Sequence, residues 1–257
     1  MNDLEKYFRS NDKRLFTKWN HYFDVYDRHF QKYRNKPVVI LEIGVFHGGS
    51  LQMWKEYFGP QAMIFGIDNN PKCKELEEEN IRIFIGSQSD RKFLREVRNQ
   101  MPPIDILIDD GGHTMEQQIV SYEELFGAIK EDGVYLCEDL HTSYWLKYGG
   151  GLKRRGSFIE YSKNFIDRLH AFHSEQPRFR VDEFTRSVDS VHYYDSIIVI
   201  EKRPRQKPVN EQSGKASYPP REVKLSALKL FMKKAERRLT IAYNQLCRFL
   251  NIPSGGW

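Results

Sequence analysis

Short apolar runs that alternate with helix-like stretches dominate the first half of this chain. The runs are 38–43, 63–67, 81–85, 104–108 and 134–137. Stretches between them, such as 91–99 and 117–130, have the apolar spacing of amphipathic helices. Strands that alternate with helices form parallel sheets through right-handed crossovers, with helices on both faces. The sequence therefore predicts an α/β fold with a doubly wound, mostly parallel, Rossmann-like sheet.

Both flanks of this pattern carry further signals. Residues 4–34 place aromatic and aliphatic side chains at helical spacing, which predicts one helix ended by Pro37. We expect 1–36 to form an N-terminal helical segment, which either packs on the core or acts as a lid over a ligand. The β-like runs 179–184 and 196–201 have no helix between them, which indicates a closing antiparallel hairpin. The predicted central domain is 37–203.

The C-terminal region differs in composition from the rest. Four prolines between 204 and 220 predict a linker over 204–221, and apolar residues at heptad spacing predict a basic amphipathic helix within 222–257. From Lys202 onward there are 13 Lys/Arg and 3 Asp/Glu, a charge of +10, so the total of +5 leaves −5 for residues 1–201. An acidic body argues against nucleic acid as the partner. We expect the helix to serve packing within the chain, a homo-oligomer, weak contact with an anionic membrane surface, or a protein partner.

The cellular compartment follows from what the sequence lacks. No apolar run approaches the roughly 18 residues of a membrane-spanning helix, and the first residues lack the order of a secretory signal. The three cysteines have no metal-binding spacing. The sequence predicts a cytoplasmic protein with free thiols.

A glycine-rich turn follows the first predicted strand, in the run Glu42-Ile43-Gly44-Val45-Phe46-His47-Gly48-Gly49-Ser50. Its glycines lack the spacing of a dinucleotide fingerprint, which places them at offsets 0, 2 and 5. S-adenosylmethionine needs no pyrophosphate cradle and suits such a turn. Asp68, at the end of the second strand, suits a ribose diol because a carboxylate accepts hydrogen bonds. The plainer interpretation is a turn glycine beside a helix N-cap.

Acidic residues end the fourth and fifth predicted strands. Asp109, Asp110 and His113 follow the fourth, and Glu138 and Asp139 follow the fifth. These ends meet at one edge of the sheet, where crowded carboxylates repel one another unless a cation lies among them. Oxygen ligands favour Mg²⁺, with another hard divalent cation as the alternative. His113 would then be near enough to act as a base. The plainer interpretation has the aspartates as helix caps.

These motifs together resemble a known family. The segments 41–44, 48–54, 66–68, 108–113 and 138–140 are similar to the metal-dependent sugar O-methyltransferases of the macrocin and mycinamicin type, and to their cephalosporin-hydroxylase-like relatives. The likeness covers about residues 8–201. It implies a class I methyltransferase that uses S-adenosylmethionine. It implies Mg²⁺ held by Asp110, Glu138 and Asp139, with His113 as general base.

The resemblance also suggests a cofactor site. Gly44, Gly48, Gly49 and Ser50 would line the methionine end, with Glu42 beneath them. Asp68 would bind the ribose, and Ser87 or Gln88 would meet the adenine edge. Asp109 would either hold the cofactor's amino group or brace its loop.

The implied reaction transfers a methyl group to a hydroxyl of a sugar or glycoside acceptor that has neighbouring hydroxyls. Residues 142–176, where acceptor specificity would lie, match no nameable acceptor. Two alternatives stay open. One is an oxidative enzyme on the same scaffold, with His113 and His141 in a 2-His-1-carboxylate iron site. The other is a non-catalytic interaction protein whose working part is the C-terminal helix.

Overall fold

The computed structural model describes residues 1–176, 179–219 and 226–250. The chain divides into two compact units, which are described separately. The first unit comprises 1–173 and 181–206 and contains the whole sheet. The second comprises 174–180 and 207–257 and contains the C-terminal helix.

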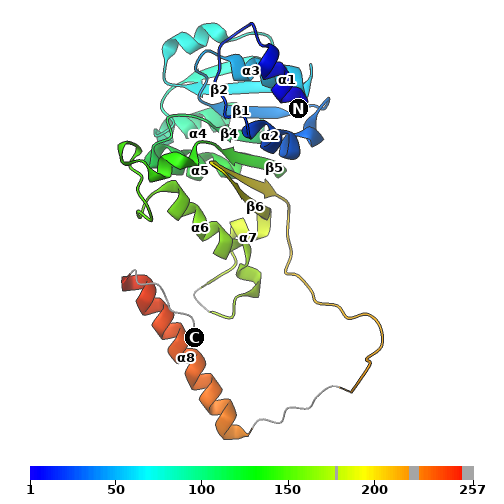
Figure 1. The fold of residues 1–257 in the computed structure, drawn as a ribbon, viewed down its shortest axis with the longest axis vertical. Coiled ribbons are helices and arrows are strands. Elements are labelled where there is room, and N and C mark those ends of the chain that lie inside the picture. The colour runs from blue at the N-terminus through cyan, green and yellow to red at the C-terminus, as the bar shows by residue number, and fades with distance from the viewer. Residues whose placement is uncertain (177–178, 220–225, 251–257) are drawn as a thin grey trace. The chain divides into compact units, whose positions relative to one another are not determined.

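The first unit is built on one seven-stranded sheet in the order β3-β2-β1-β4-β5-β7-β6 (Figure 1). Five strands are parallel, whereas β7 pairs antiparallel with both β5 and β6. The predicted doubly wound sheet with a closing antiparallel hairpin is confirmed. The strands are β1 (Val39–Ile43), β2 (Met63–Asp68), β3 (Ile81–Ile85), β4 (Ile104–Asp109), β5 (Ile129–Cys137), β6 (Val188–Tyr194) and β7 (Ile197–Lys202).

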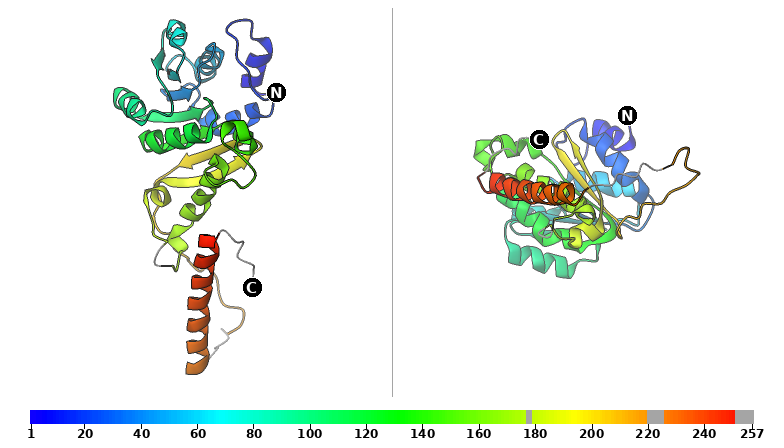
Figure 2. Two further views of the ribbon diagram at one scale, coloured as in Figure 1. Left: turned by 90° about the vertical axis from the view of Figure 1, so that its left-hand side faces the viewer. Right: turned by 90° about the horizontal axis from the view of Figure 1, so that it is seen from below.

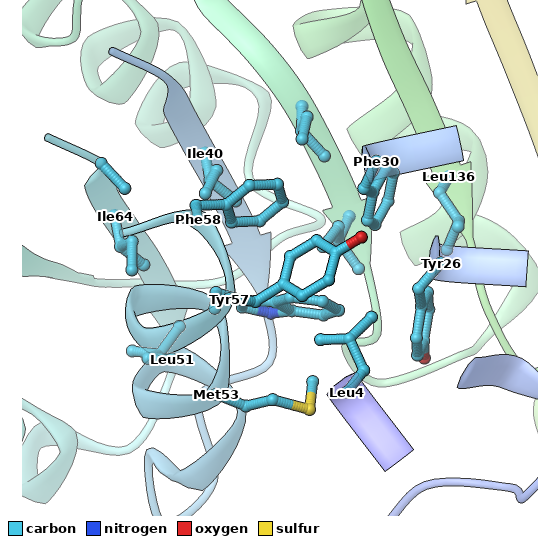
Figure 3. Close-up of a cluster of buried hydrophobic side chains, with 14 of the residues drawn as sticks. Leu4, Tyr26, Phe30, Ile40, Leu51, Met53, Tyr57, Phe58, Ile64 and Leu136 are labelled. Carbon is cyan, nitrogen blue, oxygen red and sulfur yellow. The ribbon is translucent and has the colours of Figure 1, made fainter. Parts of the chain in front are cut away.

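Helices cover both faces of the sheet because the central strands are apolar on both sides. On β1, Ile40 and Leu41 belong to two different hydrophobic clusters. The first cluster contains residues of α1 (Asp3–Ser10), α2 (Tyr22–Phe30) and α3 (Gly49–Phe58); Figure 3 shows part of it. The second contains residues of α4 (Arg91–Gln100), α5 (Met115–Leu125) and α6 (Phe158–Leu169). Burial from both sides explains why these strands read as continuous apolar runs.

The prediction of one helix over 4–34 is wrong. The structure has α1 and α2 separated by residues 11–21, which form neither helix nor strand. Asn11 starts this segment: its side-chain amide donates to the carbonyl of Arg14, and its side-chain oxygen accepts from the N–H of Lys13. Such local bonds compete with helical ones. Leu15 and Trp19, which were expected on the apolar face, are more than half exposed.

Two further element boundaries differ from the predictions. Residues 179–184 are not the first strand of the hairpin, because Asp182 caps the short helix α7 (Glu183–Ser187) and the strand β6 follows it. The strand β6 is mostly half-buried, and polar residues interrupt its sequence, so it lacks an apolar run. The predicted helix over 117–130 ends at Leu125, and β5 begins at Ile129 instead of Val134.

The second unit contains α8 (Ala227–Leu250), a single long helix (Figure 2). Its heptad residues Leu228, Met232 and Leu239 are exposed, and Leu225 lies outside the described residues. No helix in the described ranges is apolar and long enough to cross a membrane. Cys73, Cys137 and Cys247 are free, as expected. The domain boundaries at 36, 203 and 221, the homo-oligomer, the membrane-surface contact and the cytoplasmic location stay predictions.

Candidate active site

The glycine turn after β1 brings two loops into backbone contact. Gly44 has φ +96°, and a Cβ there would lie 2.1 Å from the backbone oxygen of Asp110. Gly48, the N-cap of α3, has φ +78°. A Cβ on Gly49 would lie 2.3 Å from the backbone oxygen of Arg14. These glycines therefore permit close packing of the turn against the β4 loop and the N-terminal segment.

Asp68 ties the end of β2 to the same turn. Its Oδ2 accepts from the N–H groups of Val45 and Phe46, at 2.9 and 3.0 Å, and its Oδ1 accepts from the N–H of Asn70 at 2.9 Å. A carboxylate has about four acceptor positions. Three are in use within the chain, so one acceptor position of Asp68 is left, and its expected contact with a ribose stays a prediction.

A cavity of about 940 Å³ opens along the carboxyl edge of the sheet. Its wall comes from the turn after β1, the end of β2, the loop after β3, the ends of β4 and β5, and the N-terminal segment. Of the predicted residues it is lined by Gly44, Ser50, Asp68, Ser87, Gln88, Asp110, His113, Glu138 and Asp139. Glu42, Gly48, Gly49 and Asp109 are not part of the lining.

Asp110, His113 and Asp139 lie together in this wall, and we call them the acid–histidine cluster. One donor atom of each lies within 4.8 Å of the others. The Nε2 atom of His113 is 3.5 Å from Asp139 Oδ2 and 3.9 Å from Asp110 Oδ1. His113 and Asp139 have φ values of +57° and +56°. Left-handed backbone is uncommon outside glycine, so these two loops hold conformations that aim their side chains at one another.

Lys18 lies against these carboxylates, and the sequence analysis did not find it. Its ammonium contacts Asp110 Oδ2 at 2.5 Å, both carboxylate oxygens of Glu138 at 2.9 and 3.0 Å, and Glu42 Oε1 at 3.7 Å. Only 2% of the Lys18 side chain is exposed. Lys18 belongs to the irregular segment 11–21, and residues 16–19 of that segment line the cavity at the edge of the sheet. The N-terminal region thus supplies the cation that the acidic edge requires.

Lys18 and the carboxylates around it shift one another's pKa values. Burial alone would lower the pKa of Lys18, but the carboxylates of Asp110, Glu138 and Glu42 raise it well above its usual range, so the ammonium stays charged. Burial raises the pKa of Glu42 to about 7, and Lys18 opposes that rise. Glu42 Oε2 accepts from the hydroxyl of Ser50 at 2.8 Å, which places Glu42 beneath the turn rather than in the cavity.

Two tyrosines of α2 complete the packing around the acids. The hydroxyl of Tyr22 donates to Asp139 Oδ1 at 2.7 Å, and that of Tyr26 donates to Glu138 Oε1 at 2.6 Å. Burial and the charge of Glu138 raise the pKa of Tyr26 well above its usual range, so its phenol remains a donor. Glu138 is 1% exposed and is held by Lys18 and Tyr26. Of the predicted metal ligands, Asp110 and Asp139 therefore face the cavity more freely than Glu138.

The loop after β3 is held to the β4 loop by a buried amide. Gln88 donates to Asp109 Oδ1 at 3.0 Å and accepts from the N–H of Gly112 at 2.7 Å. Asp109 is fully buried and also accepts from the hydroxyl of Ser121. Asp109 thus makes the bracing contacts that were one of its two expected roles. The hydroxyl of Ser87 bonds locally to Ser89, and the predicted contact of Ser87 or Gln88 with an adenine stays a prediction.

His141 does not join the acid–histidine cluster in the described part of the chain. Its Nδ1 atom lies 2.6 Å from the hydroxyl of Ser196, and its ring packs against Trp19 and Trp145. It lines a separate, smaller cavity. The structure therefore does not bring together the two histidines that the iron-dependent alternative requires.

Comparison with known proteins supports the family resemblance that the sequence motifs indicated. The chain is 38% identical over 195 residues to the Streptomyces olivaceus 8-demethyl-8-(2-methoxy-alpha-L-rhamnosyl)-tetracenomycin-C 3'-O-methyltransferase. It is 34% identical over 208 residues to the Micromonospora griseorubida mycinamicin VI 2''-O-methyltransferase. The predicted family resemblance is confirmed. These matches cover 72% and 77% of this chain but 50% of each relative, so the chain spans about half the length of the curated relatives it matches. No family model matches.

Solved structures agree with the sugar O-methyltransferase resemblance. The methyltransferase MycE of the mycinamycin pathway, in complex with Mg, SAH and mycinamycin VI, superposes with a TM-score of 0.69 at 29% identity. The match covers 90% of this chain and 58% of MycE. A second MycE structure, with Mg and SAH, gives 0.70 at 31% identity. The fold of this chain is therefore that of a Rossmann-like methyltransferase.

Lys18, Tyr22 and Tyr26 were missed because they belong to the N-terminal segment. The tyrosines were assigned to an apolar face, and the lysine was hidden by the single helix predicted there. The available signal was a lysine within an aromatic run, Phe16 to Phe30, in a chain whose other motifs were rich in acids.

Proposed function

We propose that this chain transfers a methyl group from S-adenosylmethionine to a hydroxyl of a sugar or glycoside, with a hard divalent cation, Mg²⁺ first, held by Asp110 and Asp139 of the acid–histidine cluster and with His113 as the general base. One observation carries the proposal: two carboxylates and an imidazole converge in the wall of a cavity that continues to the glycine turn and Asp68. The resemblance to sugar O-methyltransferases supports it.

The residues of the cavity wall fit both a hard divalent cation and S-adenosylmethionine. Asp110 and Asp139 each keep about a fifth of their side chain exposed and offer oxygen donors, which hard cations prefer. The Nδ1 atom of His113 is buried without a hydrogen-bond partner among the described residues, so this nitrogen is available for a further contact. A cavity of about 940 Å³ lies within the range of small-molecule and cofactor sites. Asp68 and Ser87 lie on its wall, away from the acids in sequence.

The cation, when bound, lowers the pKa of a hydroxyl that it contacts, and S-adenosylmethionine supplies the methyl group. His113 takes the acceptor proton at Nε2, the ring nitrogen that faces the carboxylates. Asp139, 3.5 Å away, stabilises the charge that the imidazole then carries. Tyr22 fixes Asp139 by its hydrogen bond, and Thr142 fixes the His113 loop by donating to the His113 carbonyl oxygen at 3.0 Å. Most of the rate would come from positioning and charge stabilisation.

Lys18 has a supporting role in this arrangement. It neutralises part of the charge of Glu42, Asp110 and Glu138 and holds two of these side chains in place. It leaves Asp110 Oδ1 and Asp139 Oδ2 directed toward His113.

The test is a methyl-transfer assay with rhamnosyl and related glycosides in chelator and then in added Mg²⁺. Chelator should abolish transfer and Mg²⁺ restore it, whereas calorimetry should show S-adenosylhomocysteine binding largely unchanged. An acceptor that lacks a hydroxyl beside the methylated one should fail. Full activity in chelator would instead indicate a metal-free methyltransferase whose carboxylates only cap helices.

A further inference from the structure

A second group of histidine and carboxylate side chains lies outside the cavity. His29 comes from α2, His192 from β6 and Glu201 from β7, and we call them the hairpin cluster. One donor atom of each lies within 4.8 Å of the others. None of the three lines the cavity of the proposed methyl transfer. The reaction proposed above leaves them without a role.

The three side chains converge on one point. The Nδ1 atom of His29 lies 3.1 Å from Glu201 Oε1, and the Nε2 atom of His192 lies 3.4 Å from Glu201 Oε2. The two imidazole rings are 4.9 Å apart between centroids and tilted by 58°. One ring nitrogen of each histidine thus faces the same carboxylate, one on each of its oxygens.

The hydroxyl of Tyr194 orients His29 from behind. The Nε2 atom of His29 lies 2.9 Å from the hydroxyl of Tyr194. When that hydroxyl accepts the Nε2 proton, the lone pair of His29 Nδ1 points at the cluster. Ser190 lies on the cluster side: its hydroxyl donates to Glu201 Oε2 at 3.0 Å and lies 2.9 Å from His192 Nε2, in the position that an ion would take. Imidazoles that bind metals are commonly held, as His29 is by Tyr194, by a hydrogen bond at their other ring nitrogen.

The donor types and exposure define the class of ion. Two imidazoles and one carboxylate are ligands for Zn²⁺ and its first-row neighbours, whereas Mg²⁺ prefers oxygen alone. His29 is buried, but the side chains of His192 and Glu201 are 36% and 28% exposed. An ion could therefore enter from solvent and keep a water as its fourth ligand.

We propose that His29, His192 and Glu201 bind a divalent transition metal of the Zn²⁺ class that joins α2 to the β6–β7 hairpin. The ion is structural. It links α2 to the hairpin, and α2 is the helix whose tyrosines hold Asp139 and Glu138.

The experiment uses the full chain, freed of metal and returned to excess Mg²⁺, with Co²⁺ as the spectroscopic probe. One equivalent of Co²⁺ should give the visible absorption of a four-coordinate site, raise the melting temperature and be displaced by Zn²⁺. His192→Ala and the isosteric Glu201→Gln should each abolish the absorption. Tyr194→Phe should keep it but weaken the affinity about 10–100-fold, as loss of a second-layer hydrogen bond does.

Asp110→Asn is the matched control, because it changes the acid–histidine cluster and leaves the hairpin cluster intact. It should keep the Co²⁺ absorption. The proposal is overturned if wild-type protein gives no four-coordinate absorption, or if the absorption survives Glu201→Gln and disappears in Asp110→Asn. Far-UV circular dichroism establishes that each variant is folded. Should His192→Ala fail to fold, Glu201→Gln decides the question.

Discussion

The acid–histidine cluster and the hairpin cluster contain the same kinds of side chain within the same 4.8 Å, yet their settings differ. The first is built on two loops, with left-handed backbone at His113 and Asp139, and it lines a cavity. The second is built on a helix and two strands and lines neither of the two cavities described above. Imidazole and carboxylate therefore do not by themselves identify a reaction centre. The first cluster, which we propose as the reaction centre, differs from the second in its access to a cavity and in its left-handed loop backbone.

The largest expected effect concerns the acid–histidine cluster. His113→Ala should lower turnover by roughly 10²–10⁴, the range for loss of a general base. Calorimetry should show nearly unchanged S-adenosylhomocysteine binding. His173→Ala is the control, because His173 is exposed and outside both clusters. An unimpaired His113→Ala enzyme would remove the functional distinction between the clusters.

Lys18→Met should give the largest loss of stability. It leaves Glu138, Glu42 and Asp110 without their buried cation, and breaking a buried ion pair typically costs about 3–5 kcal/mol. Denaturant unfolding measures the change in free energy. Lys92→Met, at a strongly exposed surface lysine, should change it little. Adding Glu138→Gln to Lys18→Met should restore part of the loss; a purely additive double variant would contradict the pairing.

Asp68→Ala tests the far end of the cavity. The variant should weaken S-adenosylhomocysteine binding by about 1–3 kcal/mol, the range for a charged hydrogen-bond partner. Part of that loss would come from the turn, because Asp68 also holds the N–H groups of Val45 and Phe46. Calorimetry with NAD is the matched measurement and should show no binding. Tight NAD binding would overturn the cofactor assignment.

The smallest expected effect concerns the hairpin cluster in metal-free buffer. His29 lowers the pKa of Glu201 to about 2, below the ordinary 4.5, so ionised Glu201 stabilises the fold above about pH 4.5. That stabilisation is lost as pH falls from 4.5 toward 2. Glu201→Gln should therefore cost about 1 kcal/mol at pH 7, allowing for solvent screening, and less at pH 3.5. Paired unfolding curves measure this, with Glu211→Gln in the exposed linker as control. A cost independent of pH would contradict it.

The sheet and most of the acidic edge could be predicted because their signals are local. Strands buried on both faces are apolar runs, and parallel strands end at one edge, which brings Asp110 and Asp139 together. Lys18 could not be predicted in the same way. Its contact with Glu138 spans 120 residues of sequence, and only the irregular path of 11–21 creates it. The strand β6 was missed for a different reason: it is mostly half-buried, and its polar residues Asp189, Ser190 and His192 interrupt the apolar ones.

The helix α2 carries Tyr22, Tyr26 and His29 on one side, four and then three residues apart. Seven residues of helix extend about 10 Å. Tyr22 and Tyr26 hold Asp139 and Glu138, while His29 belongs to the hairpin cluster. The same helix therefore contacts the wall of the cavity and the hairpin cluster. Thermodynamic linkage then applies in both directions. An ion at the hairpin cluster that favours one position of α2 alters the affinity of the cavity for its cation, and a cation in the cavity alters the affinity of the hairpin cluster for its ion by the same factor.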